Sequence, residues 1–231
     1  MTSLLLIPGT LCDHRLWHYQ IDDLADIAKC HVADVSQDNS LSGMAQRALN
    51  DAPKQFALAG FSLGAILALE IYRQAPERIS HLALLDGNPY PDSPARREAR
   101  FATLRRLREQ NMDSILKDVL LPLYLPPARL NDSSVVDVIL AMGRDLGATV
   151  LERQTRALLD RADNSHLFAG INCPTLALCG DTDQLCLPEW YASMTAQMPN
   201  AECVVIPNSG HFTVLEQPAL VNVALRRWLG A

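Results

Sequence analysis

One short segment of the sequence has the residue types and the spacing of a nucleophilic serine. Ser62 lies between two glycines in Gly60-Phe61-Ser62-Leu63-Gly64, after an apolar run and before a second run rich in small apolar residues. This pattern predicts a strand that turns sharply into a helix, with glycine wherever a side chain would collide as the two elements approach. Such a turn exposes the Ser62 hydroxyl, so we predict that Ser62 is a nucleophile. The alternative is a glycine-rich turn that leads into a buried helix.

A serine hydroxyl needs a base to remove its proton, and the base needs an acid to orient it. His211 follows the last expected strand, while Asp181 and Asp183 follow the strand before it. The carboxyl ends of parallel strands form the edge where ligands bind in open α/β sheets. The order serine, acid, histidine is the one that accompanies a nucleophile turn of this type. We therefore predict that His211 is the base, and at this point both aspartates are candidates for the acid.

The elements that must position these side chains alternate between strand and helix. Short apolar runs predict six strands, and helical patterns lie between most of them, as expected of a parallel sheet covered on both faces. The predicted class is α/β, with a doubly wound, mostly parallel sheet of about six strands. The runs are at residues 4–7, 31–35, 56–60, 82–85, 175–179 and 203–206.

The alternation stops between residues 88 and 164. This region has no convincing strand but four helical patterns, which prolines separate from one another. We predict a helical cap, residues 89–164, inserted into a core made of residues 1–88 and 165–231. The helical patterns are at residues 95–110, 114–121, 133–146 and 148–160.

Composition excludes several classes of protein. With 48% hydrophobic residues, a formal charge of −6 and a pI near 5.5, the chain is predicted to be globular and not to bind nucleic acid. Its six cysteines form no CxxC pair and no metal-ligand spacing, so we expect reduced thiols and no metal. No apolar stretch is long enough to span a bilayer. We expect a cytoplasmic protein without a membrane partner, and the sequence does not indicate its oligomeric state.

Residues 96–108 contain six arginines, although the protein as a whole is acidic. On a helix, Phe101, Leu104 and Leu107 fall on one side, so we expect a basic outer face. Two interpretations stay open. The face is either simply solvated, or it attracts an anionic or carrier-bound acyl substrate.

Taken together, these segments resemble the α/β-hydrolase fold over essentially the whole chain. In that family the acid usually stands third after a strand-terminal glycine, in a Gly-x-x-Asp-x-x-x-x-Pro arrangement. Asp183 matches this position, with Gly180 before it and Pro188 behind it. The resemblance therefore implies that Asp183 is the acid, with Asp181 in reserve. Asp86 matches a position that a minority of relatives use, and we expect it to be a structural loop residue.

The resemblance also implies an oxyanion hole. The family's His-Gly-x loop, with a tryptophan eight residues after the glycine, is similar to Pro8-Gly9-Thr10 and Trp17. The donors would be the backbone N–H groups of Thr10 and Leu63. Because the usual histidine is Pro8 here, the hydrogen bonding of this loop is left open.

The implied activity is that of a serine hydrolase without cofactor or metal. It would cleave a carboxylic ester, thioester or lactone of a small-molecule substrate through an acyl-enzyme on Ser62. The small cap and short loops are most similar to pimeloyl-ACP methyl ester esterases and enol-lactonases. The alternatives are a lyase of the same fold, which would use the three residues to abstract a proton, and a non-catalytic ligand-binding protein.

Overall fold

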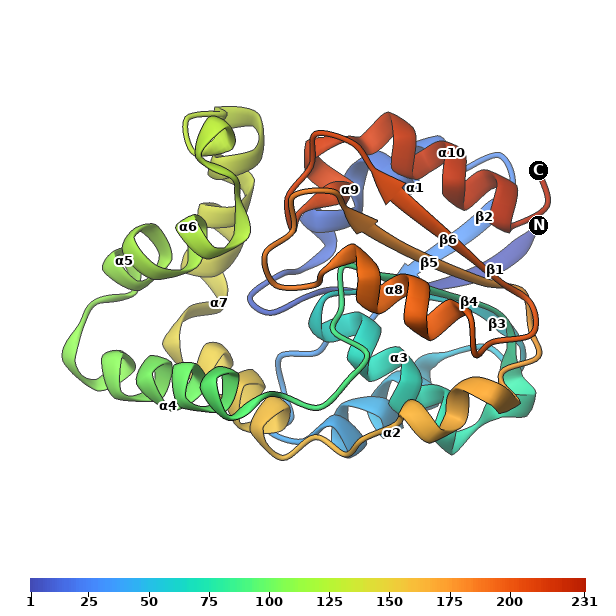
Figure 1. The fold of residues 1–231 in the computed structure, drawn as a ribbon, viewed down its shortest axis with the longest axis horizontal. Coiled ribbons are helices and arrows are strands. Elements are labelled where there is room, and N and C mark those ends of the chain that lie inside the picture. Colours follow the sequence, from blue (N-terminus) through green and yellow to red (C-terminus); the bar gives the residue numbers. More distant parts are fainter.

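A computed structural model describes all 231 residues, which fold around one six-stranded sheet (Figure 1). All neighbouring strands are parallel, in the order β2-β1-β3-β4-β5-β6. The predicted α/β class and strand number are therefore confirmed. The strands are β1 (Thr2–Ile7), β2 (Ala28–Val32), β3 (Phe56–Phe61), β4 (Ile79–Leu85), β5 (Thr175–Gly180) and β6 (Ala201–Ile206).

The second strand lies three residues earlier than the apolar run that predicted it. β2 pairs with β1 from Thr2↔Ala28 to Leu6↔Val32, and the chain then leaves the sheet. At this edge position only alternate residues are shielded, so the strand itself has little apolar character. Val35, which suggested a longer strand, is buried instead in an apolar cluster with Leu41 and Met44, which lie outside the sheet.

Helices cover both faces of the sheet (Figure 1). One face packs against α2 (Leu41–Asp51), α3 (Leu63–Gln74) and α8 (Pro188–Thr195). The other packs against α10 (Pro218–Trp228) and the segment around α1 (His18–Asp23). Pro188 and Pro218 begin their helices, as predicted, because proline lacks only an N–H that the first turn leaves unpaired.

Between β4 and β5 the chain forms helices and no strand, and these helices project to one side of the sheet (Figure 1). We call residues 89–164 the inserted helical segment; its status as a separate cap stays a prediction. Its elements are α4 (Pro94–Glu109), α5 (Met112–Ile115), a π-helical turn (Leu116–Leu120), α6 (Leu121–Tyr124) and α7 (Ser133–Leu159).

The long α7 is broken at one residue. Gly147 has φ 71° and ψ −174°, which lie outside the helical region, so two helices meet there. This agrees with the two separate helical patterns predicted at residues 133–146 and 148–160. None of the helices combines the length and the apolar composition that a bilayer crossing requires.

Candidate active site

The predicted strand, sharp turn and helix are present around Ser62. Ser62 joins β3 to α3 with φ 55° and ψ −113°, a positive φ that L-residues rarely adopt. A Cβ on Gly60 would lie 2.1 Å from the Gly64 carbonyl oxygen, and one on Gly64 would lie 2.2 Å from that of Ile7. Both positions therefore exclude any side chain. The Ser62 N–H donates to the Leu85 carbonyl at 2.8 Å, which ties the turn to β4.

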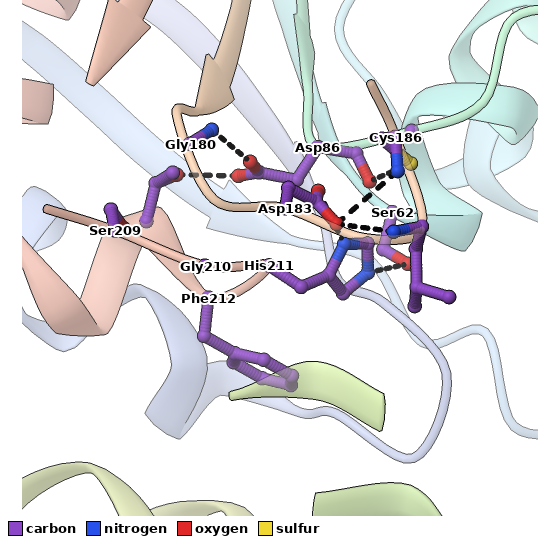
Figure 2. Close-up of polar contacts among 12 residues, drawn as sticks. Ser62, Asp86, Gly180, Asp183, Cys186, Ser209, Gly210, His211 and Phe212 are labelled. Carbon is purple, nitrogen blue, oxygen red and sulfur yellow. Dashed lines mark hydrogen bonds and ion pairs between the residues drawn. The ribbon is translucent and has the colours of Figure 1, made fainter. Parts of the chain in front are cut away.

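Three of the predicted site residues lie in one hydrogen-bonded line (Figure 2). His211 Nε2 is 2.8 Å from Ser62 Oγ, and His211 Nδ1 is 2.8 Å from Asp183 Oδ2. The second oxygen of Asp183 accepts the N–H groups of Leu185 and Cys186, at 2.7 and 3.2 Å. Asp183 is 3% exposed, so these donors compensate a buried carboxylate charge. A carboxylate at Nδ1 directs the proton there and leaves Nε2 free to accept from Ser62.

The two other candidate acids do not touch His211. Asp181 is exposed, and its carboxylate accepts the Ser209 N–H at 3.1 Å. Asp86 is fully buried, accepts the Gly180 N–H at 3.2 Å and forms a hydrogen bond with the Thr213 hydroxyl. Burial, together with the nearby Asp183 charge, raises the pKa of Asp86 well above its usual range. Asp86 therefore joins the ends of β4 and β5 and is not in contact with the base.

A buried carboxylate that the sequence analysis did not select holds the His211 loop. Glu216 accepts the Gly210 N–H at 3.0 Å and the Phe212 N–H at 2.9 Å, one on each side of His211. Burial raises the pKa of Glu216 despite these two donors. The inserted helical segment also contributes, because the His211 N–H donates to the Tyr124 carbonyl at 3.0 Å. The only sequence signal for Glu216 was an acid in an apolar stretch directly after the histidine.

The predicted oxyanion donors lie beside Ser62. Thr10 and Leu63 line the same cavity as the serine, and neither backbone N–H donates to another protein group. The next residue, Leu11, has φ 54° and donates its N–H to Gln154 Oε1 at 2.8 Å. Gln154, fully buried on α7, also donates to the Val35 carbonyl at 3.2 Å. This glutamine supplies the hydrogen bonding of the loop that Pro8 had left open, and nothing in the sequence pointed to it.

The cavity at Ser62 has a volume of about 90 Å³ and lies between the sheet edge and the inserted helical segment. One face of α4 lines it, with Arg96, Ala99, Arg100 and Thr103 at the i, i+3, i+4, i+7 spacing of a helix. Phe101, expected on the inner side, is 42% exposed. The prediction of a basic outer face is therefore wrong for Arg96 and Arg100, because the side of α4 that carries these two packs toward the serine. The other arginines of the helix are exposed, namely Arg97, Arg105, Arg106 and Arg108.

Three potential metal ligands come together at the same place. The ligand atoms of Asp183, Cys186 and His211 lie within 4.8 Å of one another. Burial raises the pKa of the Cys186 thiol well above its usual range, and this thiol donates to the Asp86 carbonyl at 3.1 Å. A metal ligand would have to be the thiolate, so this donor set does not fit a metal ion.

Known proteins resemble this chain in sequence and in fold. The family model described as the alpha/beta hydrolase family matches residues 4–224. The chain is 25% identical over 229 residues, 94% of this chain and 88% of the relative, to a pimeloyl-(acyl-carrier protein) methyl ester esterase of Yersinia enterocolitica.

Two solved structures share the fold. A thermophilic esterase from Thermogutta terrifontis, solved with malate bound, has a TM-score of 0.89 and 26% identity, covering 100% of this chain and 90% of that one. The enol-lactonase from Burkholderia xenovorans has a TM-score of 0.85 and covers 100% of this chain and 92% of that one; at 18% identity this likeness concerns the fold alone. From the match over nearly its whole length, the chain belongs to the alpha/beta hydrolase family.

Proposed function

We propose that the protein is a serine hydrolase that cleaves a carboxylic ester, thioester or lactone through an acyl-enzyme on Ser62. The observation that carries the proposal is the line from Ser62 Oγ through His211 to Asp183, with 2.8 Å at each hydrogen bond. The esterases among its relatives from Yersinia and Thermogutta support an ester as the substrate.

In the proposed reaction, His211 Nε2 accepts the Ser62 proton as Oγ attacks the carbonyl carbon of the substrate. The negative charge that develops on the carbonyl oxygen is stabilised by the N–H groups of Thr10 and Leu63. The tetrahedral intermediate collapses, the bond to the leaving group breaks, and His211 returns the proton to that group. Water then attacks the acyl-enzyme with His211 again as the base, the bond to Ser62 Oγ breaks, the acid is released, and His211 returns the proton to Oγ. Asp183 keeps the proton on Nδ1 throughout.

The inserted helical segment is proposed to act as a cap that limits the size of the acyl group. The cavity of about 90 Å³ equals the liquid volume of roughly three water molecules. Tyr124, Leu151 and Leu158 supply apolar walls, and they belong to α6 and α7 of this segment. A short acyl chain is therefore the expected substrate, not a long one.

The test uses p-nitrophenyl acetate turnover and labelling by a fluorophosphonate. Wild-type protein should turn over the ester and gain one adduct on Ser62. Ser62→Ala should lose both, with turnover falling roughly 10³-fold or more, because the three residues act as a unit. Ser80→Ala, an exposed serine on β4, is the matched control and should behave as wild type.

Three other outcomes would contradict the proposed serine hydrolase. If pure Ser62→Ala keeps more than a few per cent of the activity, the mechanism is wrong. Adduct formation without hydrolysis of any ester would favour the lyase, whose base and serine would still react. The absence of both adduct and turnover would favour a ligand-binding protein.

A further inference from the structure

Three arginines and one aspartate lie along the wall of the Ser62 cavity. They are Arg96 and Arg100 on α4, Arg161 just after α7, and Asp92 just before α4. Asp92 is 2% exposed at its side chain and pairs with Arg100 Nε at 2.5 Å and with Arg161 Nη2 at 3.0 Å. One carboxylate thus offsets only one of the three guanidinium charges on this wall, which leaves a formal charge of +2 in a chain of net charge −6.

Two of these arginines have hydrogen-bonding capacity that the protein does not use. The Arg161 side chain is only 4% exposed; its Nη2 forms an ion pair with Asp92 and donates to the Tyr90 carbonyl, but its buried Nη1 has no acceptor. The partly buried Arg96 side chain makes no hydrogen bond or ion pair within the protein. Burial, together with the charge of Arg100, lowers the pKa of Arg96. Cations held in this way are unfavourable unless an anion joins them.

Resting on the proposed function, we propose that Arg96 and Arg161 form an anion subsite that binds a carboxylate on the ester substrate. A guanidinium presents paired N–H groups that match the two oxygens of a carboxylate. A network that served only to fix the loop would need Arg100, Arg161 and Asp92, but it would not need Arg96 or leave Nη1 of Arg161 unpaired. The enzyme's substrate class is therefore a short ester with one negatively charged end.

Two placements of the carboxylate are possible, and a set of three esters separates them. p-Nitrophenyl butyrate is neutral, the p-nitrophenyl monoester of glutarate carries the charge on the acyl side, and 4-carboxyphenyl butyrate carries it on the leaving group. We expect one of the charged esters to have a kcat/KM well above the neutral one. Arg96→Gln should reduce that preference roughly 30-fold or more, as for loss of one partner of a buried ion pair.

The matched control is Arg108→Gln, which removes the same charge from an exposed position on α4 outside the cavity. It should keep the preference. Arg161→Lys retains the charge but loses the forked geometry, and should reduce the preference too. If Arg96→Gln and Arg108→Gln show the same preference as wild type, or if neither charged ester is preferred, the subsite is overturned.

A binding measurement separates this proposal from the proposed function. Calorimetry on the Ser62→Ala protein should detect glutarate but not neutral glutaramide, and Ser62→Ala with Arg96→Gln should bind glutarate roughly 30-fold more weakly. Ser62-dependent ester hydrolysis without glutarate binding would overturn the subsite and leave the hydrolase standing. Glutarate binding by a protein that cleaves no ester would support the subsite and overturn the proposed hydrolase.

Discussion

Asp181 and Asp183 are two residues apart in one loop, yet only Asp183 reaches the imidazole of His211. We expect Asp183→Asn to lower kcat roughly 10³- to 10⁴-fold, because an amide at this position allows His211 to adopt the wrong tautomer. Asp181→Asn should have little effect, because this exposed side chain only caps the Ser209 N–H. Steady-state kinetics with a p-nitrophenyl ester, on variants whose circular dichroism matches wild type, checks both. A large loss of kcat in the Asp181→Asn protein would show that the acid is misassigned.

The raised pKa of Asp86 leads to a prediction about how the stability of the protein depends on pH. Its pKa in the folded protein is raised by burial and by the Asp183 charge, so the folded state binds this proton more tightly than the unfolded state does. The contribution of Asp86 to stability therefore falls as the pH rises from the ordinary pKa of an aspartate, about 4, toward the raised pKa of the folded state. Asp86→Asn removes this ionisation. The amide can still accept from the Gly180 N–H and donate to the Thr213 hydroxyl.

We expect the free energy of unfolding of Asp86→Asn to increase relative to wild type as the pH rises above about 4, and the difference then to level off. Urea titrations at several pH values between 4 and 8 measure it. Wild-type and variant curves that stay parallel over this range would contradict the raised pKa.

At the scale of elements, Gly147 allows α7 to change direction above the cavity. A Cβ there would meet no atom within 4 Å, so backbone strain at φ 71° is the whole cost of a side chain. We expect Gly147→Ala to lower the free energy of unfolding by about 1–3 kcal/mol. Gly170→Ala is the matched control, since that glycine also faces open space but has no positive φ. Equal urea midpoints for the two variants would contradict this account.

The same helix holds the predicted oxyanion loop through Gln154. Gln154→Leu would leave the Leu11 N–H and the Val35 carbonyl without their side-chain partner. We expect kcat to fall by up to about 10²-fold with a smaller change in KM, because the adjacent Thr10 N–H would be misplaced for the transition state. Gln197 is an exposed glutamine between α8 and β6 that does not line the cavity, so Gln197→Leu should not change either constant. A change in KM alone would indicate a role in substrate binding instead.

At the scale of the whole molecule, the sheet and the inserted helical segment share one apolar cluster. Leu6 and Leu178 of the strands belong to the same cluster as Leu120, Ile139 and Leu151 of the segment. Separating the two parts would expose this cluster, so we expect them to unfold together. Trp17, Trp190 and Trp228 all lie outside residues 89–164, so their fluorescence reports on the sheet and its own helices, while circular dichroism also reports on the segment. The two urea curves should coincide, and an earlier transition by circular dichroism would show that the segment unfolds first.

The local features of this protein could be predicted from its sequence. The tight turn at Ser62 requires glycine at positions 60 and 64, because a side chain there would collide with nearby backbone. This requirement can be recognised from the residues next to the serine. The alternation of strands and helices could be predicted from short apolar runs with helical patterns between most of them. β2 was misplaced because an edge strand is only half shielded, so its sequence carries a weaker signal.

Tertiary structure alone decided which distant side chains meet. Gln154 reaches Leu11 across 143 residues, and the choice between Asp181 and Asp183 depends on how the β5 loop turns toward His211. Arg96 and Arg100 of α4 face the serine because packing, and not helical periodicity, sets the rotation of a helix about its axis. A sequence pattern shows which residues share a helix face, but only contacts between elements determine what that face meets.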